Sequence, residues 1–187
     1  LVFAPIDPQI PATLDFGLVG HWPLDEGAGT TSADVWGSGR DGALQGGATW
    51  ASGIFGSALE FDGQNGVFVA GGTNPAIGRD DDFSWSFWTW LSSGNDKFAT
   101  LLGNRSGGRT SPPQFARFTP NAFEYYANGF FPWIDQVLPT GQWVHAAVVK
   151  RDRTFTYYRN GLPVASGVTE VVMDAIPLYF GGDPVAG

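Results

Sequence analysis

Residues 82–91 read DFSWSFWTWL, and this stretch decides the fold. Three tryptophans and two phenylalanines in ten residues favour a β-strand, because aromatic side chains fit a pleated, half-buried surface. Side chains along a strand alternate between two faces. One face would hold Phe83, Trp85, Phe87, Thr89 and Leu91. The other would hold Ser84, Ser86, Trp88 and Trp90. We expect the first face to pack in a core.

Short apolar runs of this kind recur along the chain, separated by glycine and aspartate. We expect strands at residues 18–22, 58–61, 66–70, 83–91, 99–102, 122–126, 143–150, 155–159, 163–165 and 177–180. Asn160-Gly161 is a pair that favours a tight two-residue hairpin. We find no long helical period and no internal repeat. Many short strands at this spacing predict an all-β fold, an antiparallel two-sheet β-sandwich or jelly roll.

Composition narrows the classes of function. The chain has 187 residues, a formal net charge of −8 and no cysteine. The acidic balance argues against nucleic acid, whose phosphates need a basic patch. No apolar run reaches the roughly 18 residues that a membrane span needs. The absence of cysteine excludes disulfides and thiolate chemistry.

Six segments occur in an order that resembles the laminin-G-like domain of the concanavalin A-like lectin/glucanase superfamily. They are GLVGHWPLDEG (17–27), DVWGSGRDGAL (34–44), FGSALEFDG (55–63), FSWSFW (83–88), GQWVHAAVVK (141–150) and YYRNGLPVASG (157–167). The resemblance implies a concanavalin A-like jelly roll, and calcium and carbohydrate ligands are common in that superfamily. Trp88 matches a recurrent tryptophan of the family, which implies a structural role.

The ends of the chain are expected to depart from the family pattern. Residues 1–16 contain three prolines and predict an extended arm or linker. Residues 17–187 would form the sandwich. The family continues with a closing strand that has no counterpart here, so we expect that strand to come from a longer chain or a neighbouring subunit.

Exposed aromatic rings and nearby polar groups are the candidates for sugar binding. Trp133 and Trp36 are expected in loops, and Trp90 lies where the family usually has a polar residue. The alternative, which the sequence favours for each ring, is that it covers the core or the edge of the sandwich. Asn104, Arg105 and Asn128 could supply hydrogen bonds around a sugar, although the sequence does not bring them together.

Asp34 and Asp41 are candidate calcium ligands in the stretch DVWGSGRDG. Glycines between the two aspartates would let the loop curl, so that carboxylates and carbonyls converge on an ion. Asp62 is a weaker third candidate. The alternative is that these aspartates accept hydrogen bonds from turn amides.

The sequence contains no enzyme signature. The glucanases of the superfamily carry a strand with alternating acids, and no strand here does so. We therefore expect a non-catalytic binding or adhesion module for a glycan or polysaccharide, extracellular or on a cell surface. The main alternative is a structural subunit of a surface layer, filament or virion, which would pair with neighbouring subunits. A glycoside hydrolase or lyase is a second alternative.

Overall fold

The computed structural model describes residues 17–36, 39–62, 66–70, 81–92, 99–104, 114–127, 133–168 and 178–182. Its elements are strands: β1 Thr31–Ser32, β2 Gly42–Gly46, β3 Thr49–Ser52, β4 Ser57–Glu60, β5 Gly66–Ala70, β6 Phe83–Trp90, β7 Leu102–Gly103, β8 Gln114–Phe118, β9 Ala122–Ala127, β10 Trp133–Asp135, β11 Trp143–Arg151, β12 Thr154–Arg159, β13 Leu162–Val168 and β14 Tyr179–Phe180. Within these ranges no helix has the length and apolar character to cross a membrane.

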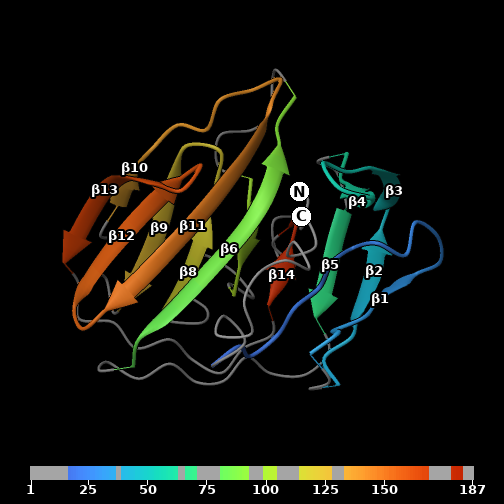
Figure 1. The fold of residues 1–187 in the computed structure, drawn as a ribbon, viewed down its shortest axis with the longest axis horizontal. Helices are drawn as coiled ribbons and strands as arrows, with labels where there is room; N and C mark the ends of the chain where they lie inside the picture. Colours follow the sequence, from blue (N-terminus) through green and yellow to red (C-terminus); the bar gives the residue numbers. More distant parts are fainter. Residues whose placement is uncertain are drawn as a thin grey trace.

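The strands form two main layers and a small hairpin. One sheet has the order β1-β2-β5-β14-β7-β8-β9-β10, the second has the order β13-β12-β11-β6, and β3 and β4 pair with each other. Each pairing within these sheets is antiparallel. In Figure 1 the four-stranded sheet lies in front of β8 and β9, and the β3–β4 hairpin lies beyond the upper end of β5. The all-β sandwich predicted from the sequence is confirmed.

The core lies between the two sheets and is built from aromatic rings. Phe87 of β6 and Phe118 of β8 pack edge to face with centroids 4.8 Å apart, and Phe123 of β9 contacts Phe155 of β12 at 5.5 Å. Phe87 is 2% exposed and Phe118 is fully buried. Burying one such ring contributes about 1.5–3 kcal/mol. These aromatic contacts join the four-stranded sheet to the eight-stranded sheet.

The predicted alternation along β6 is confirmed with one qualification. Phe87, Thr89 and Leu91 are buried, whereas Phe83 and Trp85 are only partly buried against the core. The two rings lie at the start of the strand, where Phe83 packs on Phe155. The solvent exposure of the inner face therefore decreases toward the end of β6.

The Asn160-Gly161 hairpin between β12 and β13 is also confirmed. Both residues have positive φ, 50° and 78°, as the tight type I′ turn requires. The register pairs Arg159 with Leu162, and it shifts between Tyr157 and Tyr158, which marks a β-bulge.

Strand prediction was wrong in two ways. Residues 18–22 do not form a strand, because backbone and side-chain bonds hold them to a loop: Val35 donates to the His21 carbonyl at 2.9 Å, and the His21 amide donates to Asp34 at 2.9 Å. In addition, β1, β2, β3, β8 and β10 were not expected. Glycine and small polar residues fill β2 (GALQG) and β3 (TWAS), so their pairing depends on neighbours more than on local preference.

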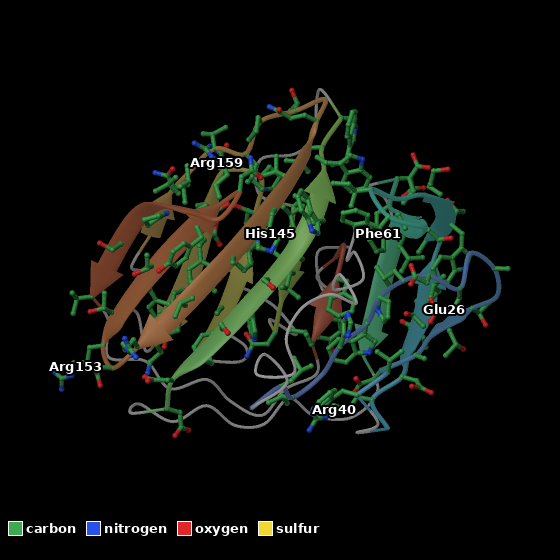
Figure 2. All side chains as sticks on the ribbon, viewed as in Figure 1. Glu26, Arg40, Phe61, His145, Arg153 and Arg159 are labelled. Carbon is green, nitrogen blue, oxygen red and sulfur yellow. The ribbon has the colours of Figure 1, made fainter. Side chains whose placement is uncertain are left out.

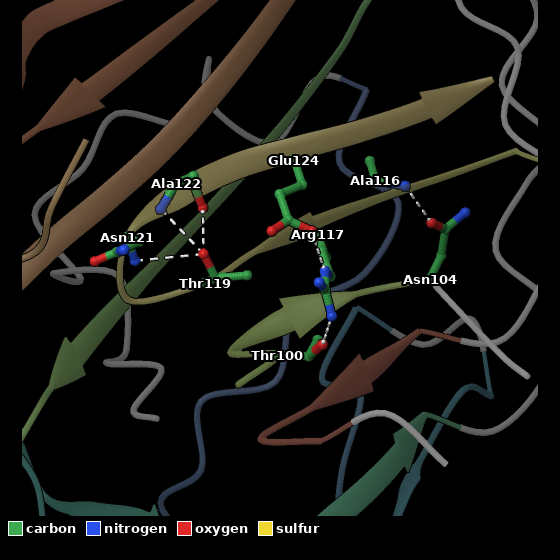
Figure 3. A network of polar contacts seen from close by, with 8 residues as sticks. All are labelled: Thr100, Asn104, Ala116, Arg117, Thr119, Asn121, Ala122 and Glu124. Carbon is green, nitrogen blue, oxygen red and sulfur yellow. Dashed lines mark hydrogen bonds and ion pairs between the residues drawn. The ribbon is translucent and has the colours of Figure 1, made fainter. Parts of the chain in front are cut away.

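An ion pair between a buried carboxylate and a partly buried guanidinium lies on the eight-stranded sheet (Figure 3). Arg117 of β8 and Glu124 of β9 are cross-strand neighbours, and Arg117 Nε lies 2.5 Å from Glu124 Oε2. Arg117 also donates to Thr100 Oγ1 at 3.1 Å. The side chain of Arg117 is 11% exposed and that of Glu124 is 2% exposed. The attraction between the two charges compensates in part for the hydration that each side chain loses on burial.

Candidate functional site

A cleft of about 450 Å³ lies between the β3–β4 hairpin and the end of β6. We call it the Trp90 cleft. Figure 2 shows Phe61, the residue that follows β4 by one position, between the upper end of β6 and the hairpin. The cleft is formed where the two-stranded and four-stranded sheets approach each other. Its lining includes Ser52, Glu60, Phe61, Trp90, Ser92 and Trp143.

Two tryptophans form one side of the cleft. Trp90, at the end of β6, is directly opposite Trp143, at the start of β11. Their rings meet at 65° with centroids 5.8 Å apart, so the edge of one ring is directed at the other. Trp90 remains 45% exposed. It is therefore a large aromatic ring that is held by a neighbour and still accessible from solvent.

Phe61 and Gly181 also line the cleft and contact each other. Gly181 has a φ of 74°, and a Cβ atom added there would collide with the Phe61 ring. The Gly181 amide also donates to the Leu101 carbonyl at 2.8 Å. Glycine at this position lets the ring lie against the backbone and fixes that part of the cleft lining.

The polar groups of the Trp90 cleft are mostly hydroxyls. Ser52 and Ser92 are exposed and line it, and Glu60 is the one charged group among its described lining residues. Thr100 also lines the cleft, but its hydroxyl accepts a bond from Arg117. Glycoside hydrolysis needs a pair of carboxyl groups across the bond that breaks. Among the described lining residues, Glu60 supplies one such group.

A larger hollow, of about 1140 Å³, lies at the opposite end of β6 and β11. Its tryptophans, Trp22 and Trp85, pack in or against the core. Lys150, which also lines it, is 1% exposed and donates to the Asp81 carbonyl at 2.5 Å. Because these aromatic faces are already used in packing, this hollow is a weaker candidate for a ligand than the Trp90 cleft.

Of the six residues predicted to bind a sugar, Trp90 lines the cleft. Trp36 is 42% exposed in the turn after Asp34, and is not among the lining residues of either hollow. Trp133 begins β10 and is not in a loop as expected; its side chain is outside the part that the structure describes. Arg105 and Asn128 also lie outside the described residues.

Asn104 has a different place from the one predicted. It is 1% exposed, and its Oδ1 accepts a hydrogen bond from the Ala116 amide at 2.8 Å. A buried amide that satisfies a neighbouring strand stabilises the sheet and is not available at the surface. Phe61 and Trp143 line the cleft but were not predicted to do so. Phe61 is the last residue of an expected strand and Trp143 the first residue of another, so the sequence favours a place in the core for both.

The predicted calcium ligands accept hydrogen bonds from backbone amides. Asp34 is 5% exposed, and its Oδ1 accepts from His21 at 2.9 Å and from Trp36 at 3.2 Å. Asp41 Oδ1 accepts from the Asp34 amide at 3.0 Å. Asp62 is exposed. Within the described ranges no three His, Cys, Asp or Glu side chains gather to hold a metal. Calcium at Asp34, Asp41 and Asp62 stays a prediction.

Comparison with known proteins identifies the family. The family model of the concanavalin A-like lectin/glucanases superfamily matches residues 61–187. The chain therefore belongs to this superfamily. No curated protein matched the chain in the sequence search.

Solved structures share the fold at low sequence identity. One is domain 4 of a GH43 extracellular arabinanase from Geobacillus stearothermophilus, in complex with arabinotriose, with 20% identity and a TM-score of 0.61; the match covers 80% of this chain and 77% of that one. Another is the Trypanosoma rangeli sialidase in complex with sialic acid, with 19% identity and a TM-score of 0.63. The match covers 100% of this chain and 31% of the sialidase.

Proposed function

We propose that this chain is a non-catalytic glycan-binding module and that Trp90 is the platform on which a sugar ring stacks. The observation that carries the proposal is the exposure of Trp90, 45%, at the edge of a cleft. The face of an aromatic ring carries a negative partial charge, so it attracts the C–H groups on the apolar side of a sugar. Binding sites combine such an apolar wall with a few well-placed polar groups.

The rest of the cleft suits a small, neutral ligand segment. Trp143 supports Trp90 from the side, and the exposed residues Ser52 and Ser92 also line the cleft. The arabinanase domain of the same fold holds arabinotriose, which makes arabinan the first polysaccharide to test. The extracellular nature of that enzyme also supports an extracellular or cell-surface location as part of the proposal.

Affinity electrophoresis tests the proposal. The protein is run through native gels that contain arabinan, xylan, mannan, β-glucan, levan or mucin. We expect retardation by at least one of them, and we expect Trp90→Ala to remove it. Trp36→Ala is the matched control, because Trp36 is similarly exposed, 42%, and is not among the cleft's lining residues.

Two results would overturn the proposal. One is normal migration in all six gels. The other is a Trp36→Ala variant that no longer binds, together with a Trp90→Ala variant that binds as the wild type does. That result would place the site at the loop that holds Asp34 and Trp36. Release of reducing sugar from a retarding polysaccharide by the wild-type protein would contradict the non-catalytic part.

A further inference from the structure

The outer face of β6 and β11 consists of four cross-strand pairs. They are Trp90–Trp143, Trp88–His145, Ser86–Ala147 and Ser84–Val149. The residues between them on each strand face the core, as Phe87, Val144, Ala146 and Val148 do. In Figure 2 His145 lies on the side of this sheet that faces the viewer. The first pair borders the Trp90 cleft, so the face continues directly from it.

Three rings form a cluster next to that first pair. Trp88 lies two residues before Trp90 on the same face, which is about 7 Å along a strand. Its ring contacts His145, with centroids 5.3 Å apart, and Phe55, with centroids 6.5 Å apart at 83°. We call these three residues the Trp88 cluster. Phe55 is 53% exposed, which leaves a large apolar ring in contact with solvent.

The cluster and the cleft share the same two walls. Phe55 lies in the turn between β3 and β4, and the strands of this hairpin supply Ser52 and Glu60 to the cleft. Trp88 and Trp90 belong to β6. A chain molecule bound across Trp90 would therefore meet the Trp88 cluster if it continued along the strand.

His145 gives the cluster a polar group without charge. Its backbone is fixed by Asn160, whose Oδ1 accepts from the His145 amide at 2.9 Å and whose amide donates to the His145 carbonyl at 2.8 Å. Burial lowers the pKa of His145, so the ring is neutral at pH 7. A neutral imidazole has one donor and one acceptor nitrogen, and a sugar hydroxyl can pair with either.

None of the eight side chains of this face carries a charge at neutral pH, although the whole chain has a net charge of −8. An acidic sugar would find no cation on the face and would be repelled by the overall field. Aromatic rings, serines and one neutral imidazole match the alternating C–H faces and hydroxyls of an uncharged glycan.

We propose that the Trp88 cluster is a second sugar subsite, and that the ligand is an uncharged oligosaccharide that runs from the Trp90 cleft along the outer face of β6 and β11. This inference rests on the proposed function, because the first subsite is Trp90. It adds the extent of the ligand, its lack of charge and the role of His145 and Phe55 as specificity-determining residues.

Calorimetric titration with oligosaccharides of increasing length tests the proposal. The series is cut from the polysaccharide that retards the wild-type protein most strongly; for arabinan it runs from arabinobiose to arabino-octaose. We expect the Kd of the wild-type protein to fall at least tenfold between the shortest and the longest. His145→Ala and Phe55→Ala should bind the short sugars as the wild type does and lose the gain with length. Val168→Ala, at a site 69% exposed on the same sheet, is the control and should keep that gain.

The outcomes separate this inference from the proposed function. If Trp90→Ala loses short and long sugars alike while His145→Ala and Phe55→Ala keep the full length dependence, the second subsite is wrong and the glycan-binding function stands. If no polysaccharide binds, both are wrong. An oligogalacturonide or sialyllactose that binds more tightly than a neutral sugar of equal length would overturn the assignment of an uncharged ligand.

Discussion

Removal of one member of the Arg117–Glu124 pair should destabilise the protein strongly. Glu124→Leu leaves the Arg117 guanidinium, 11% exposed, without its carboxylate. Breaking a buried ion pair costs about 3–5 kcal/mol, because a charge stays buried without its partner. Arg117 keeps its bond to Thr100, so we expect a loss near 3 kcal/mol. In a chain of this size that lowers Tm by about 6–12 °C.

The complementary change separates the cost of an unpaired charge from the cost of lost packing. Arg117→Met alone should also destabilise, since Glu124 is 2% exposed. The double variant Arg117→Met/Glu124→Leu removes both charges and fills the site with apolar atoms, a replacement that is often neutral. We expect it to be more stable than either single variant, by about 2 kcal/mol or more.

Urea unfolding, followed by tryptophan fluorescence and circular dichroism, measures these differences. The slope of the free energy against urea should stay constant, which shows that the variants expose the same surface on unfolding. The reasoning is refuted if Glu124→Leu costs less than about 1 kcal/mol, or if the losses of the two single variants simply add in the double variant.

Three further predictions concern other parts of the molecule. Gly181→Ala should lower the free energy of unfolding by about 2 kcal/mol or more, because the new methyl group meets the Phe61 ring at a positive φ; wild-type stability in urea would contradict this. Burial raises the pKa of Tyr157 from 10.0 to about 12, so its contribution to stability is fully present below pH 10 and is lost as the pH rises through 12, by about 3 kcal/mol in all. Tyr157→Phe should show a smaller loss across that range, and an unchanged pH dependence would count against the assignment. If calcium binds at Asp34 and Asp41, a hundredfold excess over Kd should stabilise the fold by about 2.7 kcal/mol, and identical melting curves in calcium and in chelator would oppose this.

The fold could be predicted wherever burial alternates along one strand. In β6 the aromatic residues Phe83, Trp85 and Phe87 alternate with Ser84 and Ser86, and the observed burial alternates in the same way. The Asn160-Gly161 turn was equally readable, because its conformation depends on the two residues themselves. Strands β2 and β3 could not be recognised, because their glycines and small polar residues pair through the register of their neighbours.

The candidate site was only partly predictable for a related reason. Trp90 stood out as a large ring on a face that also carries serines. The cleft beside it depends on the β3–β4 hairpin, and β3 was not predicted. Phe61 is a site residue only because Gly181, 120 positions later in the sequence, allows its ring to lie there. The burial of Asn104 could not be predicted, because a single sequence does not show which side-chain amides hydrogen-bond to a neighbouring strand.

The bulge in β13, where Val164 is the extra residue opposite Tyr157 and Tyr158 of β12, bears on how the protein behaves when many copies are crowded together. Among the described strands, β13 pairs with β12 alone, and Leu162 and Val168 at its two ends are each 69% exposed. An edge strand with apolar ends invites pairing with another chain, which is the first step of aggregation. Pro163 offers no amide donor, and the register shift between Tyr157 and Tyr158 distorts the ladder beside it. A second molecule would therefore find this edge interrupted near its start, which disfavours edge-to-edge pairing when many copies of the protein are close together.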